Sequence, residues 1–516
     1  MDVLRHDLFY WQLVHYLVIE QGMRVIEVSP SQQEIWLEHE HSKKRRVLRI
    51  VRADIDWANW LRREIDTTTK KFDDLRKQFG DRSMLGLNIY VSTYSPIDAW
   101  EHHVLEANNN QLNPRTNVET FLLENRKQER VSAIKQVFER IMLPAPNLAN
   151  WDLVDEIEME YLKDEVLQEA KRRRKHEESL FTYGKPIFTY VLLAVILLMF
   201  SVVEYIGSST NMRTLIEFGA KYNPLIVEGE WWRFFSAMFL HIGFLHLFMN
   251  SFALFYLGGA VEKIFGTRRF IIIYLVAGLF GSAASFAFNE AVSAGASGAI
   301  FGCFGALLYF GVIHRRLFWR TIGMSVVVIL TINLALGFAV PMIDNGAHIG
   351  GLVGGFLASA FVHLPSHLPR WKKQFLIFIL TSAAFLALLG FGFVNDNKSG
   401  SPLVNVQLAQ EYIQDDKFEN AYPLLVEAID EGVELAEAYF LLAYVEAHLE
   451  RFEDAHHHLL LTIELREDFH EAHYNLALIY LELGQDEEAL TSVTRALEHE
   501  PDDENYRLLY EELHQE

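Results

Sequence analysis

Seven apolar blocks fill the middle of this 516-residue chain and constrain its fold more than any other feature. They lie at about 186–207, 234–257, 269–288, 296–314, 319–340, 345–363 and 373–393. Each is close to the ~20 residues that an α-helix needs to cross the hydrocarbon core of a bilayer. The pattern predicts a mostly α-helical protein with a polytopic membrane domain of seven spans.

Lysine and arginine cluster in alternate loops between these blocks. The basic loops contain Lys171–Lys175, then Lys263, Arg268 and Arg269, then Arg315, Arg316 and Arg320, and finally Arg370, Lys372 and Lys373. Short loops rich in bases stay on the cytoplasmic side of a membrane. We therefore expect a cytoplasmic N-terminus and, after seven spans, an extracellular C-terminus. A buried helical core of a soluble protein would not show this alternation.

The segment before the first block, residues 1–180, predicts a soluble mixed α/β domain. Strands are expected at 24–29, 34–41, 46–55 and 87–95, and helices at 58–79, 117–142 and 150–178. Four histidines, His39, His41, His102 and His103, could bind a metal, but solvated surface histidines are the more common case. No secretory signal is predicted, because the first residues include acids and lack a small-residue cleavage site.

The segment after the last block repeats with a period of 34 residues. Alanines recur at 409, 443 and 477, and again at 421, 455 and 489. This spacing resembles the tetratricopeptide repeat family and predicts an α-solenoid with a concave face for a protein partner. A purely structural cap is the alternative. From Ser401 onward the segment holds 29 acidic and 5 basic residues, so nucleic acid is excluded as its partner. We place the domain boundaries at 1–180, 181–395 and 396–516.

Several polar residues interrupt the apolar blocks, where they are costly and usually functional. The second block contains His241, His246 and Asn250, the fourth opens near Ser297, and the sixth opens near His348. By the loop charges, all of them lie slightly below the outer surface. A serine hydroxyl becomes a useful nucleophile when an imidazole takes its proton. The sequence therefore predicts a serine–histidine site, with His246, Asn250 and the Ser297 amide as oxyanion donors.

Small residues surround both members of this predicted pair. Gly298–Gly302 and Gly351–Gly355 are small-xxx-small pairs, which let two membrane helices approach closely. Ser297 alone, within "GASG", would more often be a packing residue, and His348 alone a satisfied polar residue. Only the combination indicates chemistry.

With these motifs, residues 186–363 resemble the rhomboid family of intramembrane serine proteases. The resemblance rests on Trp232-Arg233, on the H-x4-H-x3-N spacing of the second block, on Gly258 and Glu262, and on "GASG" and "AHIGG". It implies a six-helix core with one added span, Ser297 as nucleophile and His348 as base in a dyad without a carboxylate. His246 and Asn250 would line the oxyanion hole, and His241, Trp232, Arg233 and Glu262 would support the site. Phe301 stands where family members often carry tyrosine, so its ring could stack on His348 without the hydroxyl.

The resemblance also implies substrates and a location. The substrates would be transmembrane segments of membrane proteins, cut near the outer face, in what is expected to be a bacterial plasma membrane. No metal or cofactor is expected. A rhomboid-like scaffold that binds or recruits membrane proteins without cutting them is the main alternative. A transporter is disfavoured because the polar residues gather at one depth, and a zinc protease of the H-E-x-x-H type is excluded because no block contains that motif.

Overall fold

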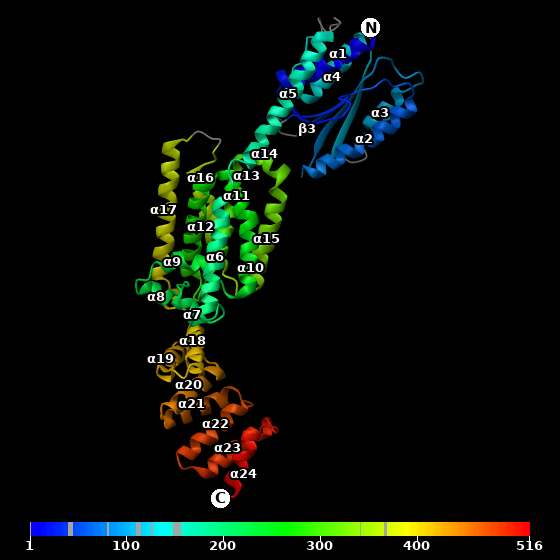
Figure 1. The fold of residues 1–516 in the computed structure, drawn as a ribbon. Helices are drawn as coiled ribbons and strands as arrows, with labels where there is room; N and C mark the ends of the chain where they lie inside the picture. Colours follow the sequence, from blue (N-terminus) through cyan, green and yellow to red (C-terminus); the bar gives the residue numbers. More distant parts are fainter. Residues whose placement is uncertain are drawn as a thin grey trace. The chain divides into compact units, whose positions relative to one another are not determined.

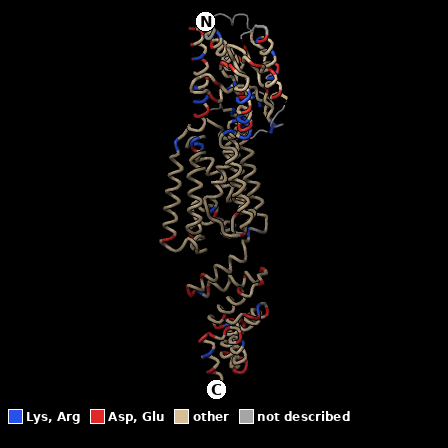
Figure 2. The backbone as a smooth tube through the Cα atoms, turned by 90° about the vertical axis from the view of Figure 1, so that its right-hand side faces the viewer, with Lys and Arg blue, Asp and Glu red and all other residues tan. Residues whose placement is uncertain are grey.

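The computed structural model describes residues 2–39, 45–79, 82–109, 115–124, 127–147, 156–340, 342–365 and 369–515 (Figure 1). The chain forms two compact units. One comprises Met1–Phe181 with His314–Met324, and the other Thr182–Ile313 with Ser325–Glu516. Charged residues concentrate at the N-terminal domain and the C-terminal repeats, whereas the long helices between them in sequence are nearly free of charge (Figure 2).

The N-terminal unit is a five-stranded sheet with helices on both faces. Its strands are β1 (Arg24–Val28), β2 (Glu34–Glu38), β3 (Arg45–Arg52), β4 (Met84–Val91) and β5 (Thr116–Leu123), in the order β1-β2-β3-β4-β5. The first three strands pair antiparallel, and β3, β4 and β5 pair in parallel. The helices are α1 (Asp2–His15), α2 (Ala58–Gln78), α3 (Glu101–Asn109), α4 (Lys127–Ile141) and α5 (Glu156–Phe181).

Two apolar cores explain this layering. Residues of α1 and α4, such as Phe9 and Phe138, pack with Leu48 and Ile89 of the sheet. Residues of α2, such as Phe72 and Leu61, pack in separate clusters on alternate strand positions. Because successive strand side chains point to opposite faces, a sheet covered on both sides reads as nearly continuous apolar runs.

One prediction for this unit is wrong. Residues 117–142 are not a single helix, because Thr116–Leu123 form β5 and the helix α4 begins at Lys127. The strand shows alternating burial along "TNVETFLL" and is held by parallel pairing with β4. Helices α1 and α3 were not predicted. Residues 150–155 of the predicted third helix, and His41, lie outside the described residues.

The predicted apolar blocks correspond to helices of the second unit. Five helices are long and apolar enough to cross a membrane: α6 (Ile187–Ile206), the continuous run Gly243–Phe265, α12 (Thr267–Phe288), α16 (Asn345–Val362) and α17 (Trp371–Val394). The run Gly243–Phe265 consists of α10 (Gly243–Ala253), a π-helical turn (Leu254–Gly258) and α11 (Gly259–Phe265). A sixth candidate is the sharply bent pair α14 (Arg315–Thr321) and α15 (Gly323–Ala339). The remaining block, the fourth along the chain, is the shorter apolar helix α13 (Ser297–Ile313).

Two block boundaries need correction. The second block was expected to be helical from residue 234, but its spanning helix begins at Gly243. The preceding residues form the short helix α9 (Arg233–Ser236) and a 3₁₀ turn (Ala237–Phe239). They belong to the long connection between α6 and α10, which also contains α7 (Met212–Glu217) and α8 (Asn223–Val227) and is called the outer connection after the side that the loop charges predict for it. The fifth block is interrupted at Ile322, which ends α14. Apolar composition alone does not separate a span from a buried loop.

Helices α12, α13 and α16 form the tightly packed centre of the second unit. Glycines make this possible, because a Cβ built on Gly298 would lie 3.3 Å from the Ala347 carbonyl oxygen and one on Gly281 only 2.9 Å from it. A Cβ on Gly351 would overlap the Gly298 carbonyl, and one on Gly355 the backbone of Gly302. The predicted close approach of the two small-xxx-small pairs is thus present.

The C-terminal repeats form seven helices in antiparallel pairs. They are α18 (Pro402–Gln414), α19 (Phe418–Asp430), α20 (Ala436–His448), α21 (Phe452–Leu465), α22 (His470–Glu482), α23 (Asp486–His499) and α24 (Glu504–Gln515). All six alanines of the 34-residue period are buried, as predicted. The first repeat helix packs on the outer connection, where the Glu411 carboxylate accepts the amides of Met212 (2.7 Å) and Arg213 (2.8 Å).

Candidate active site

Ser297 and His348 meet at the centre of the second unit. Ser297 is the first residue of α13 and His348 lies in the first turn of α16. The Ser297 Oγ is 3.0 Å from the His348 Nε2, a hydrogen-bond distance. The Phe301 ring, one turn along α13, stacks on the imidazole with a centroid separation of 4.0 Å and an interplanar angle of 10°. The imidazole is therefore held between a hydroxyl and an aromatic face.

The two other histidines lie on the opposite side of Ser297. Gly295 has φ +143°, and a Cβ there would lie 2.8 Å from the His246 Cε1, so only glycine lets this ring reach the segment before the serine. The His241 Nε2 lies 3.5 Å from the amide of Ala296, and its ring centroid is 5.3 Å from that of His246. His241 thus supports both the second ring and the backbone beside Ser297.

Asn250 lies one turn after His246 on α10 and is mostly buried. Its amide Nδ2 donates to the His246 carbonyl at 3.0 Å. This bond uses one of the two N–H groups of the amide, and the other can donate to a ligand at the serine.

Three further residues named from the sequence lie away from the serine. Trp232 is half exposed and stacks under the Arg233 guanidinium, 4.8 Å from the ring centroid. Arg233 is buried and donates to the carbonyls of Ile216 (2.6 Å) and Ala220 (3.0 Å), which ties the outer connection together. Glu262 is fully buried at the opposite end of α10–α11 and accepts hydrogen bonds from both α6 and α12.

Two charged residues near the dyad were not singled out from the sequence. Asp344 caps the N-terminus of α16, where its Oδ1 accepts the amide of Ala347 at 2.9 Å. Lys221 is fully buried in the outer connection and donates to the carbonyls of Asn289 (2.8 Å) and Ala291 (2.7 Å). Burial lowers the pKa of the Lys221 amine to about 8, against the opposing influence of Asp344 and Glu290, so the amine is still mostly charged at neutral pH. The N-cap position of Asp344 was a readable signal, whereas nothing local marks Lys221.

A small cavity of about 20 Å³ lies behind the nucleophile, lined by Ser297, Lys221, Ser285, Ser293 and Ala347 among others. Its volume and polar walls suit one water molecule.

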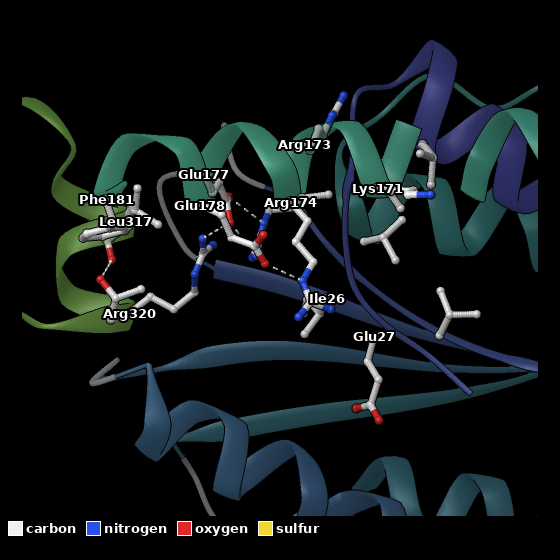
Figure 3. Close-up of a pocket in the computed structure, with 16 residues that line it drawn as sticks. Ile26, Glu27, Lys171, Arg173, Arg174, Glu177, Glu178, Phe181, Leu317 and Arg320 are labelled. Atoms are coloured by element: carbon white, nitrogen blue, oxygen red, sulfur yellow. Dashed lines mark hydrogen bonds and ion pairs between the residues drawn. The ribbon is translucent and has the colours of Figure 1, made fainter. Parts of the chain in front are cut away.

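A larger cavity, of about 610 Å³, lies in the N-terminal unit between α5, β1 and α14 (Figure 3). Its arginines are already paired with carboxylates. Arg320 bonds Glu177 at 2.6 Å and Arg174 bonds Glu178 at 3.0 Å. Within the described ranges, no three histidine, cysteine or acidic side chains gather closely enough to hold a metal. This cavity is therefore less suited to catalysis than the serine site.

Sequence comparison places these residues in a known context. Residues 228–365 match the rhomboid domain, and residues 470–503 match the tetratricopeptide repeat. The chain is 39% identical over 421 residues to rhomboid protease GluP of Bacillus subtilis, covering 81% of this chain and 80% of that protein. It is 33% identical over 178 residues to the putative rhomboid protease YdcA of the same organism, covering 34% of this chain and 87% of the relative.

A plant protein is also similar in sequence to this chain. RHOMBOID-like protein 5 of Arabidopsis thaliana is 40% identical over 151 residues, which cover 28% of this chain and 48% of the relative. The likeness to the Bacillus protease, in contrast, spans most of both chains. The domain match and this similarity over most of both chains show that the chain is a multi-pass membrane protein of the rhomboid protease family.

Proposed function

We propose that this protein is an intramembrane serine endopeptidase in which Ser297 is the nucleophile and His348 the general base. The observation that carries the proposal is the 3.0 Å contact between the Ser297 Oγ and the His348 Nε2 in a chain of this family. Stacking on Phe301 supports it, because a fixed ring plane keeps the Nε2 directed at the hydroxyl. The missing tyrosine hydroxyl at this position leaves the stacking intact.

The proposed reaction has two stages. His348 Nε2 takes the proton of Ser297 as its Oγ bonds to the scissile carbonyl carbon, and it then delivers that proton to the leaving amine as the peptide C–N bond breaks. Water, activated by the same imidazole, hydrolyses the resulting acyl-enzyme ester. The α13 N-terminus presents the Ser297 amide to the oxyanion, and His246 adds a donor from the opposite side. Asn250 joins them through the amide N–H that the His246 carbonyl does not engage.

The proposed substrates are transmembrane segments that unwind near the outer face. Peptide bonds inside an intact helix are shielded by their own hydrogen bonds, so small or helix-breaking residues near the cleaved bond favour attack. The loop charges support a cytoplasmic N-terminus and an extracellular repeat domain. There the repeats would bind a protein partner, and the acidic surface favours basic segments of that partner. The domain boundaries at 180 and 395 belong to the same proposal.

Cleavage of a reporter tests the chemistry. The full-length protein and its Ser297→Ala and His348→Ala variants are expressed with a single-span reporter that has small residues near its outer end. We expect cleavage by the wild type and none by either variant. Ser359→Ala is the matched control, because Ser359 is buried on the same helix as His348 but bonds only the Gly355 carbonyl, at 2.7 Å.

A fluorophosphonate probe separates chemistry from substrate choice. Labelling that is lost in Ser297→Ala establishes a reactive serine even when a given reporter stays intact. A wild type that neither cleaves several such reporters nor takes the label refutes the proposal and supports the non-cleaving scaffold.

A further inference from the structure

Two charged residues, the fully buried Lys221 and the half-buried Asp344, lie near the proposed dyad without taking part in its chemistry. Asp344 lies four residues before His348, and Lys221 lies in the outer connection just before α8. Each holds the backbone that carries one member of the dyad. Their role is what remains to be explained.

Asp344 fixes the helix that carries the base. Its Oδ1 accepts the amide of Ala347, the residue directly before His348, at 2.9 Å. The Ser285 hydroxyl of α12 donates to its other carboxylate oxygen. The carboxylate therefore joins the first turn of α16 to the neighbouring helix. Any tilt of that turn would move the imidazole, because His348 is only three residues inside the helix.

Lys221 fixes the segment that leads into the nucleophile. Its Nζ donates to the carbonyls of Asn289 and Ala291, which follow the end of α12. Its backbone exchanges two hydrogen bonds with Ser293, at 2.8 and 3.0 Å. Ser293 is four residues before Ser297. The lysine thus holds both ends of the stretch 289–293 against the outer connection.

The Asn289 carbonyl does not need Lys221 as a hydrogen-bond donor, because the Asn223 Nδ2 already donates to it at 3.2 Å. A fully buried ammonium is unfavourable unless an opposite charge compensates it. Asp344 is the nearby opposite charge, because Lys221 lines the same small cavity as Ser285 and Ala347, the two residues that the Asp344 carboxylate bonds. The same cavity borders Ser297, and the Nδ1 of His348 is buried without a hydrogen-bond partner among the described residues.

We propose that Asp344 and Lys221 are paired positioning residues for the dyad. Asp344 sets the helix of the base, Lys221 sets the approach to the nucleophile, and their mutual attraction keeps Ser297 and His348 at hydrogen-bond distance. This inference rests on the proposed function. It adds a carboxylate to a site that the family resemblance describes as having none, although this carboxylate touches neither reacting group.

Kinetics on the full-length protein test the proposal. Reporter cleavage is measured in detergent for Asp344→Ala, Asp344→Asn, Lys221→Met and the Lys221→Met/Asp344→Asn double variant. We expect kcat to fall about 10–100-fold in Asp344→Ala with KM within about twofold, since small misplacement of catalytic groups slows the reaction by such factors. Asp344→Asn retains an acceptor for the helix cap but leaves the Lys221 ammonium uncompensated, so it should recover only part of that loss.

The double variant tests the pairing. Lys221→Met is expected to lower kcat about tenfold, because it leaves the carboxylate uncompensated. The double variant should lose less than the product of the two single losses, since neither charge then remains unpaired. Losses that multiply independently would refute the pairing.

Asn211→Ala is the matched control. Asn211 caps α7, where its Oδ1 accepts the Thr214 amide at 2.8 Å, away from the dyad. It should destabilise the protein comparably to the loss of the α16 cap but leave kcat unchanged. The inference is overturned when Asp344→Ala keeps a kcat within twofold of wild type, or when both cap variants lower kcat equally. Where Asp344→Ala does not fold, Lys221→Met and the double variant decide in the same way.

The activity of the wild type shows whether the proposed function fails or only the inference about Asp344 and Lys221. A wild type without cleavage or probe labelling refutes the proposed function and this inference together. An active wild type with unimpaired Asp344 and Lys221 variants refutes the inference alone.

Discussion

Glu262 is expected to hold three helices together, and its replacement offers a sharp test of the fold. The carboxylate is fully buried on α11. One oxygen accepts the Phe188 amide at 2.9 Å and the Thr267 hydroxyl at 2.7 Å. The other accepts the Thr189 amide at 2.8 Å and its hydroxyl at 2.7 Å. It therefore caps α6 and bonds the hydroxyl of Thr267, the first residue of α12.

The magnitude follows from these four contacts. Glu262→Gln keeps one oxygen but replaces the other with an NH₂ group, which cannot accept from the Thr189 amide. A hydrogen bond to a charged group contributes roughly 1.5–3 kcal/mol, and an amide left buried without an acceptor costs about 1–3 kcal/mol. Because such losses overlap, we expect Glu262→Gln to lower the free energy of unfolding by about 2–4 kcal/mol. Glu262→Ala should lower it further.

The assay is reversible unfolding of the full-length protein in mixed micelles of mild detergent and dodecyl sulfate. Glu228→Gln is the matched control, because Glu228 is an exposed glutamate of the outer connection and should change stability by less than about 0.5 kcal/mol. A Glu262→Gln protein as stable as this control would refute the reasoning that the carboxylate is a structural cap.

Two further outcomes follow from local geometry. Gly351→Ala should lower the thermal midpoint and the protease activity, because its Cβ would overlap the Gly298 carbonyl. Gly390→Ala is the control, because the space around Gly390 is open, and it should leave the thermal midpoint and the activity unchanged. In the N-terminal unit, burial raises the pKa of Asp54, but hydrogen bonds from Arg52 and Thr93 outweigh it and hold the pKa at about 2. That stabilisation is present above the usual carboxyl pKa near 4 and is lost as the pH falls to about 2. Asp54→Asn should therefore lower the urea midpoint of this unit at pH 7 and make progressively less difference below pH 4. Pulse proteolysis, with thermolysin at pH 7 and pepsin at lower pH, measures that midpoint. An equal difference between wild type and variant at pH 7 and at low pH would contradict a stabilising Asp54 carboxylate.

Much of the fold was predictable because it is written in local composition. Apolar runs near the length of a bilayer predicted the long helices, since no other arrangement hides so many apolar side chains and their backbone groups. The 34-residue period predicted the repeats, because each buried alanine reports a contact between neighbouring helices. The polar residues Ser297 and His348 stood out for the same reason, as exceptions inside apolar surroundings.

The wrong boundaries arose where local composition fits two structures. Thr116–Leu123 is a strand only because β4 lies beside it, and the same residues could continue the helix that follows. Residues 234–242 are apolar enough for a span, yet they begin with short turns held by Gly295, whose amide donates to the Ala237 carbonyl at 2.9 Å and which is distant in sequence. Pairing partners of this kind cannot be identified from a single segment.

The sequence by itself determined the class of the protein: apolar helices in a membrane, a serine and a histidine that interrupt them, and an acidic repeat domain. Only the tertiary structure decided which groups act on one another. It brought Asp344 and Lys221, which are far apart in the chain, close to the same dyad. The physical reason is that hydrophobicity and periodicity are properties of a segment. Hydrogen bonds and charge compensation are properties of pairs, which folding alone selects.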